Sequence, residues 1–430
     1  MSNKMSDKMS NARLITTVLV MGACWSICYL IPFIQYVFYD PFQQLLGCSN
    51  AQLGLLMTVY GFGNLYGCPI GGWIADRYNY KIIYAGSVLM NGILGIIFVL
   101  NPTYSAAMFI WVGFSVASLI MNYPSHIKII RSLVGDENQG KIFGFNETSV
   151  GIGNIIFNAF MMFLFAKFLE GTGGLKAAIL GLSVLSILLC FAAWFVIPYT
   201  NKSKEQVKAG GEPAPEKHRM GVADYKNILK NPATWLIALS IFSIYSFQTT
   251  MSYFTPYFTD VLGATVAFTG VVAIIRSYGM TLVGAPIGGM LTDKIGSASK
   301  VLMGAQITGI ICLVLIMVIG RALPEAALIA LTLLIALVVF MARGSYYAVI
   351  TELKVPKKYT AATIGIAAAI GFSPDMFQFL LFGNLLDKFG NVGYTYMFTY
   401  QIVVLFIGLI TAFTVLKIKH KIPAAGEEVA

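Results

Sequence analysis

The stretch PIGGWIADR at residues 69–77 decides the fold, because it returns as PIGGMLTDK at residues 286–294, 217 positions later. A shorter match occurs in the same order, with YLIPF at 29–33 and YFTPY at 253–257, offset by 224. Matches that keep their order and nearly one spacing indicate an internal duplication. We therefore predict two similar halves in parallel repeat.

The composition assigns both halves to the membrane. Hydrophobic residues make up 57% of the 430-residue chain and charged residues 11%, whereas soluble proteins carry about 25% charged residues. A spanning helix needs about 20 apolar residues, and lipid offers the backbone no hydrogen-bond partner, so each span must be helical. We predict an all-α membrane protein with two pseudo-symmetric six-helix bundles, whose first span is not a cleaved signal peptide. The expected twelve spans lie near 14–38, 53–75, 82–100, 105–122, 143–166, 175–198, 232–259, 264–292, 301–320, 325–350, 360–386 and 394–416.

Three regions follow from these spans: a six-helix bundle at 1–200, a polar linker with an interfacial helix at 201–230, and a second bundle at 231–430. An even number of spans puts both termini on one side, and that side holds 24 of the 29 Lys and Arg residues. The positive-inside rule then predicts cytoplasmic termini in a multi-pass protein of a bacterial inner membrane. The net charge of +10 is thus a topology signal, which excludes a nucleic-acid partner.

Cofactor and enzyme chemistry find no support in the sequence. The six cysteines form no CxxC pair, and the three histidines, at 126, 218 and 420, fall outside the expected apolar blocks. This argues against a disulfide framework, a metal site or a haem in the membrane. The sequence also lacks GxxxxGK[ST], HExxH and GxSxG motifs, so we expect neither direct ATP hydrolysis nor enzymatic activity.

The repeated motif points to one family. The run GWIADRYNYK at 72–81 resembles the G-x-x-x-D-[RK]-x-G-[RK]-[RK] signature between helices two and three of the major facilitator superfamily, and the second copy resembles its repeat between helices eight and nine. One departure is that Asn79 and Tyr80 replace a glycine and a basic residue. The resemblance implies twelve spans in 6+6 halves and a conformational latch on the cytoplasmic face. The latch residues would be Gly72, Asp76, Arg77 and Lys81, with Gly289, Asp293 and Lys294 in the second copy.

Physical reasons support that motif, although a charged turn that only sets topology would also explain its basic residues. Glycines at 63, 67 and 71 are four residues apart, so they share one helix face and let another helix approach closely. Asp76 follows Gly72 by one turn, where it can reach the positive end of a neighbouring helix.

Three charges within the spans are candidate functional groups, because an ionisable residue at bilayer depth costs about 2.5–3.5 kcal/mol on insertion scales. Arg276 lies halfway along span eight, and Arg343 in the inner half of span ten. Each is a candidate anion contact; a structural salt bridge for Arg276 and snorkelling to the surface for Arg343 are the alternatives. Asp375 follows Pro374 in span eleven, which suits proton coupling, pairing with Arg276, or both. In several anion carriers of the superfamily that the chain resembles, helix eight carries an arginine.

Aromatic and polar side chains complete the candidate site, since rings with hydroxyl groups suit an organic solute. Interfacial aromatic belts would explain some of them without any substrate. The chosen substrate contacts beside the two arginines are Trp25, Tyr29, Gln248, Tyr253 and Tyr346.

The hypothesis is a secondary transporter that carries a small organic anion, a carboxylate or sugar acid, by rocker-switch alternating access with proton symport. A neutral sugar or drug carrier of the same fold, and a non-transporting receptor, are the alternatives. The expected partners are the solute, protons and the lipid bilayer, and we expect a monomer.

Overall fold

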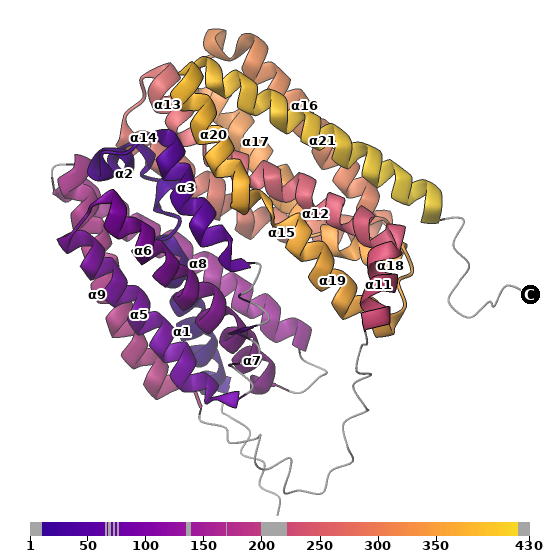
Figure 1. Ribbon diagram of the computed structural model, residues 1–430, viewed down its shortest axis with the longest axis horizontal. Helices are drawn as coiled ribbons and strands as arrows, with labels where there is room; N and C mark the ends of the chain where they lie inside the picture. The colour runs from indigo at the N-terminus through magenta and orange to yellow at the C-terminus, as the bar shows by residue number, and fades with distance from the viewer. Residues whose placement is uncertain are drawn as a thin grey trace, which may run out of the picture. The chain divides into compact units, whose positions relative to one another are not determined.

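The computed structural model describes residues 11–64, 67, 70, 71, 74, 77–134, 139–168, 170–198 and 222–419. Within these ranges the regular structure is helical and no strand occurs, as Figure 1 shows. The chain divides into two compact units, residues 1–34 with 63–200, and residues 35–62 with 201–430. Residues 35–62 therefore group with the second unit although they precede the repeat boundary in the sequence.

The first unit is a helical bundle in which α1 packs against α8 and α9, and α5 packs against α9. A π-helix, η2, continues α6 into α7; such widened turns occur often at functional sites. The elements are α1 (Asn11–Leu30), α5 (Tyr80–Leu100), α6 (Tyr104–Ser115), η2 (Val116–Asn122), α7 (Tyr123–Leu133), α8 (Gln139–Lys167) and α9 (Gly171–Val196).

The second unit begins with η1 (Ile34–Tyr36, whose first residue belongs to the first unit), α2 (Tyr39–Leu46) and α3 (Asn50–Gly61). The remaining elements are α11 (Val222–Lys230), α12 (Pro232–Met251), α13 (Phe254–Leu262), α14 (Val266–Ile274), η4 (Ile275–Gly279), α15 (Met280–Ile295), α16 (Ala298–Ile319), η5 (Gly320–Ala322), α17 (Glu325–Arg343), η6 (Tyr346–Ala348), α18 (Val349–Glu352), α19 (Lys357–Gly371), α20 (Pro374–Phe389) and α21 (Val392–Lys419).

Ten helical stretches of the described residues are long and apolar enough to cross a membrane. The second predicted span contains residues outside the description. The seventh is broken at residues 252–253 between α12 and α13, because Pro256 has no N–H to donate to the carbonyl of residue 252. The helix expected in the linker is present as α11, and its position at the membrane interface stays a prediction. The rest of the linker, 201–221, lies outside the described residues.

The repeated glycines make equivalent contacts in the two repeats, and the predicted close approach at Gly71 is confirmed. A Cβ at Gly71 would collide with the carbonyl oxygen of Ile120, and a Cβ at Gly288 would collide with that of Met341. The two glycines are 217 positions apart and their partners 221 apart, which matches the spacing of the internal duplication. The duplicated sequence therefore produces the same helix packing twice.

Candidate functional site

Arg276 lies in η4 and is completely buried. Its Nη2 donates to Thr255 Oγ1 at 2.8 Å, and its guanidinium lies 5.6 Å from the centre of the Phe254 ring. Thr255 in turn donates to the Tyr36 carbonyl oxygen at 2.9 Å. The break between α12 and α13 thus presents Thr255 to the arginine.

The positive charge of Arg276 has no carboxylate partner in the described part of the chain. Two of its donor atoms, Nε and Nη1, have no hydrogen-bond acceptor among those residues. Asp375 is not a partner of Arg276 in this structure. A buried arginine whose donors lack acceptors is energetically costly, so its environment suits the binding of an anion.

Asp375 lies in the first turn of α20 and is only 2% exposed. The predicted proline break is present, since α19 ends at Gly371 and α20 begins at Pro374. The N-terminal end of a helix favours a negative charge, and the Tyr245 hydroxyl donates to Asp375 Oδ2 at 2.7 Å. The Tyr36 hydroxyl lies within electrostatic range of this carboxyl group.

Arg343 differs from Arg276 because its side chain is exposed. Its Nη1 donates to Gln248 Oε1 at 2.9 Å, so two predicted substrate contacts are neighbours. The Tyr36 and Tyr245 hydroxyls lie within electrostatic range of both Arg343 and Asp375. One part of the second unit therefore combines a guanidinium, a carboxyl group, an amide and phenol hydroxyls.

The other predicted contacts of the second unit are buried. Tyr253 is 1% exposed, and its hydroxyl donates to the Phe379 carbonyl oxygen at 3.0 Å. Tyr346 is 2% exposed and its ring packs edge-on against Tyr347 at 4.6 Å. In this conformation neither side chain is exposed to solvent.

The first unit contains an aromatic cluster around Trp25. Its ring centre lies 5.0 Å from that of Tyr29, 5.5 Å from that of Tyr123 and 4.6 Å from that of His126. The Tyr29 hydroxyl also donates to the Ser118 carbonyl oxygen at 3.2 Å. Trp25 and Tyr29 are only half-buried, which leaves ring surface available to a solute.

His126 was missed by the sequence reasoning, and the expectation that every histidine lies outside the apolar blocks was wrong. His126 lies in the apolar stretch Tyr104–Leu133 and is completely buried. Its Nδ1 is 3.1 Å from the Tyr84 hydroxyl, and its Nε2 is 3.0 Å from Asn146 Oδ1. The expected block ended at 122, because polar residues after that position lower the local hydropathy.

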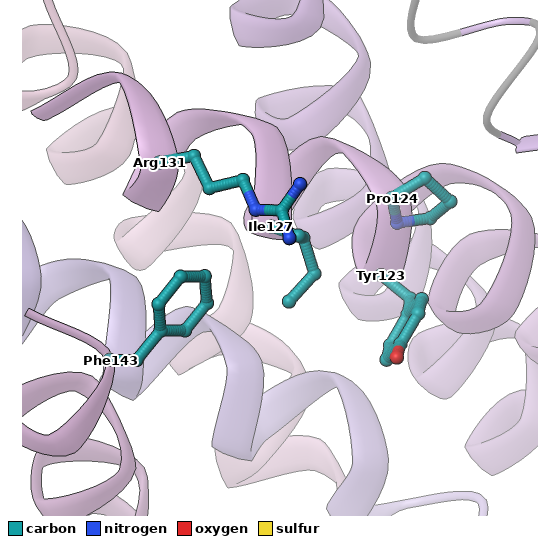
Figure 2. Close-up of a pocket in the computed structure, with 5 residues that line it drawn as sticks. All are labelled: Tyr123, Pro124, Ile127, Arg131 and Phe143. Carbon is teal, nitrogen blue, oxygen red and sulfur yellow. The ribbon is translucent and has the colours of Figure 1, made fainter. Parts of the chain in front are cut away.

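A hollow of about 420 Å³ lies beside this cluster between α7 and α8. Figure 2 shows the Tyr123 and Phe143 rings reaching into one space bordered by the Arg131 guanidinium; Pro124 and Ile127 complete the lining. Tyr123, Ile127 and Arg131 are spaced four residues apart, so they lie along one face of α7.

The latch residues are only partly described. Gly72 and Asp76 lie outside the described residues, and Arg77 is exposed. The Lys81 ammonium lies 5.2 Å from the centre of the Trp194 ring. In the second copy Asp293 and Lys294 are exposed and a Cβ at Gly289 would meet no atom within 4 Å. The latch role stays a prediction.

Comparison with known proteins agrees with this architecture. The family model of the Major Facilitator Superfamily matches residues 13–374. Inner membrane protein YihN of Escherichia coli (strain K12) is 31% identical over 403 residues, which cover 93% of this chain and 94% of that protein. Inner membrane protein YqcE of the same organism is 26% identical over 376 residues, covering 86% and 87% of the two chains.

Solved structures show the same fold at low sequence identity. A bacterial homologue of the human lysosomal transporter Spinster, in an inward-facing and unoccupied conformation, superposes with a TM-score of 0.73 at 16% identity, covering 96% of this chain and 98% of the other. The nucleoside transporter NupG superposes with a TM-score of 0.68 at 15% identity, covering 96% and 100%. The chain therefore belongs to the major facilitator superfamily of membrane transporters, and it is a transporter and not an enzyme.

Proposed function

We propose that this transporter carries a small organic anion, a carboxylate or sugar acid, and couples its movement to protons by rocker-switch alternating access. The observation that carries the proposal is the Arg276 guanidinium, which is completely buried, has two donor atoms without an acceptor and has no carboxylate partner among the described residues. An anion bound at Arg276 would supply the missing charge.

Arginine suits this role because its planar guanidinium binds a carboxylate through two parallel N–H bonds. Thr255 occupies Nη2, so the unoccupied Nε and Nη1 remain for a ligand. A neutral sugar would offer hydroxyl oxygens to these donors but no negative charge. The lack of a carboxylate partner in the described part of the chain therefore favours an anionic substrate over a neutral one.

The groups around Arg343 suit the rest of such a solute. The Arg343–Gln248 pair and the Tyr245 hydroxyl combine charge with hydrogen-bonding capacity. Carboxylate, amide and phenol groups bind vicinal hydroxyls well, as a sugar acid would require. The half-buried Trp25 and Tyr29 rings of the first unit are proposed substrate contacts in their own right, since they offer apolar surface to a solute.

Asp375 is the proposed proton-coupling residue. Its carboxyl group is buried and accepts a hydrogen bond from Tyr245. Protonation removes its negative charge, and so changes its interaction with the Tyr36 and Tyr245 hydroxyls. A charge that changes with protonation can shift the balance between two conformations.

The test is the thermal stability of the detergent-purified protein against organic acids, sugar acids, neutral sugars and amines at two pH values. A ligand that binds the folded state raises the melting temperature by mass action. We expect a sugar acid or carboxylate to raise it in the wild type and in an Arg77→Gln control, but not in Arg276→Gln. A shift with neutral sugars or amines alone would contradict the anion proposal. Binding without uptake into proteoliposomes would favour a receptor.

A further inference from the structure

The indole ring of Trp25 is oriented by neighbouring rings and not by a hydrogen bond of its own. Trp25 is half-buried in α1, and among the described residues its side chain makes ring contacts but no hydrogen bond. The shortest of these contacts is with the His126 imidazole, whose centre lies 4.6 Å away with the two ring planes at 61°. Edge-to-face ring pairs have a preferred geometry. The orientation of Trp25 therefore depends on how firmly His126 is held.

The His126 imidazole is fixed on both sides of its ring. Its Nδ1 lies 3.1 Å from the Tyr84 hydroxyl, and its Nε2 lies 3.0 Å from Asn146 Oδ1. The Tyr84 hydroxyl also donates to the Met21 carbonyl oxygen at 2.9 Å. Tyr84, Asn146 and Met21 belong to α5, α8 and α1, and all three are buried. Three helices thus hold the imidazole plane, which cannot rotate without breaking both bonds.

The need for a fixed ring plane explains why a polar side chain fills this space. His126 is completely buried inside a membrane span, where each polar group needs a partner and is costly without one. An apolar side chain of the same volume would need no partner, but only packing would limit its rotation. Hydrogen bonds at two opposite nitrogens fix the ring plane as well as the volume.

The ring that His126 supports adjoins open space. The centre of the Tyr123 ring lies 5.5 Å from that of Trp25, and Tyr123 also lines the hollow of about 420 Å³ between α7 and α8. Trp25 itself is not fully covered. Its indole N–H therefore remains for an oxygen atom of a solute, and the ring offers an apolar surface beside it.

We propose that His126 is a positioning residue for solute binding, because it holds the Trp25 indole in the orientation in which the ring and its N–H group meet the solute. A ring that is held in advance loses less rotational freedom on binding, so the affinity is higher. The role of His126 rests on the proposed role of Trp25 as a substrate contact, but not on the charge of the substrate. All the residues involved belong to the first unit.

The experiment records the fluorine NMR resonance of Trp25 in the full-length protein in detergent, labelled with a fluorinated tryptophan and assigned with Trp25→Phe. His126→Phe keeps a ring beside Trp25 but loses both anchoring bonds. The double variant Tyr84→Phe with Asn146→Leu keeps His126 and removes the same two bonds. Asn91→Ala is the matched control, because Asn91 is as buried as His126 and donates to a backbone carbonyl of α1 at 3.0 Å, but has no ring to place against Trp25.

We expect a single narrow Trp25 resonance in the wild type and in Asn91→Ala, and a shifted and broadened resonance in His126→Phe and in the double variant. Unchanged spectra in both of these variants would overturn the proposal. A change in His126→Phe alone, which the new ring explains by itself, would overturn it too. So would an equal change in the control, because general loosening of the bundle then explains the effect.

A titration with glucuronate, as a probe sugar acid, then tests the link to binding. We expect glucuronate to move the Trp25 resonance of the wild type, and its Kd to rise about 3- to 10-fold in His126→Phe and in the double variant, but not in Asn91→Ala. An unchanged Kd in variants with altered spectra would overturn the positioning role. A wild-type resonance that ignores glucuronate would contradict the sugar-acid proposal instead, while the spectra without ligand still decide whether His126 holds Trp25.

Discussion

Replacing Arg276 by methionine should make the substrate-free transporter more stable while abolishing anion binding. Arg276 is completely buried, and two of its donors have no acceptor among the residues that the structure describes. The desolvation penalty of a buried ion is several kcal/mol, and methionine is unbranched, apolar and adaptable enough to fill the space. Most single substitutions in a protein core destabilise, so the expected sign is unusual and informative.

Two interactions of Arg276 are lost in this variant, and their loss opposes the expected stabilisation. The bond to Thr255 Oγ1 contributes about 1.5–3 kcal/mol as a charged hydrogen bond, and the contact with the Phe254 ring about 1–2 kcal/mol. Burying the methionine side chain returns about 1.5–3 kcal/mol. With the desolvation penalty removed, the net stabilisation is about 1–3 kcal/mol, within the range measured when buried ionic groups are replaced by apolar ones.

The assay is thermal unfolding of the purified protein in detergent without ligand and then with a stabilising anion. We expect a melting temperature higher by several degrees in Arg276→Met, at about 2–4 °C per kcal/mol for a unit of this size, and no further rise with the anion. Arg343→Met is the matched control, because that side chain is exposed and its removal relieves no desolvation. A destabilised Arg276→Met that still responds to the anion would refute the reasoning and make Arg276 structural.

Three further changes test other parts of the structure. Asp375→Asn should abolish proton-driven accumulation of substrate in proteoliposomes but allow substrate exchange. The reason is that the asparagine amide still accepts the Tyr245 hydrogen bond but cannot titrate. Retained accumulation would exclude Asp375 from coupling. His126→Ala should lower the unfolding free energy by about 2–4 kcal/mol, because it leaves a cavity and removes a hydrogen-bond partner from Tyr84 and Asn146. An unchanged denaturant midpoint would contradict this. Gly288→Ala should lower the melting temperature of the protein, because its Cβ would meet the backbone of α17. Gly289→Ala is the control, since its Cβ would meet no atom within 4 Å. Equal melting temperatures of the two variants would show that α15 and α17 can separate without cost.

The twelve-span fold and the superfamily could be predicted from the sequence for simple reasons. Lipid forces every span to satisfy its own backbone, so length and hydropathy locate the spans without knowledge of packing. The duplicated PIGG motif identified the internal repeat, and Gly71 lets another helix approach closely, as the glycine spacing predicted. His126 escaped this reasoning because local hydropathy averages over neighbours and does not register one buried imidazole.

The partners of the buried charges could not be predicted. The sequence placed Arg276 in span eight and Asp375 in span eleven of one bundle, and left open whether they pair. Their separation depends on the π-helix η4, the break before α13 and the break before α20. Each changes the direction in which a side chain projects, and such a rotation leaves no trace in composition or periodicity.

The sequence by itself determined that this protein is a duplicated bundle of membrane-spanning helices, because hydrophobic length and repeated motifs are properties of the chain alone. Tertiary structure alone decided that Arg276 is held by Thr255, with no carboxylate partner among the described residues. It also decided that His126 is buried between Tyr84 and Asn146, and that Asp387 holds the start of α3. Those contacts join residues on different helical elements. They form only when helix breaks, π-helical turns and close packing at glycines bring particular helix faces together.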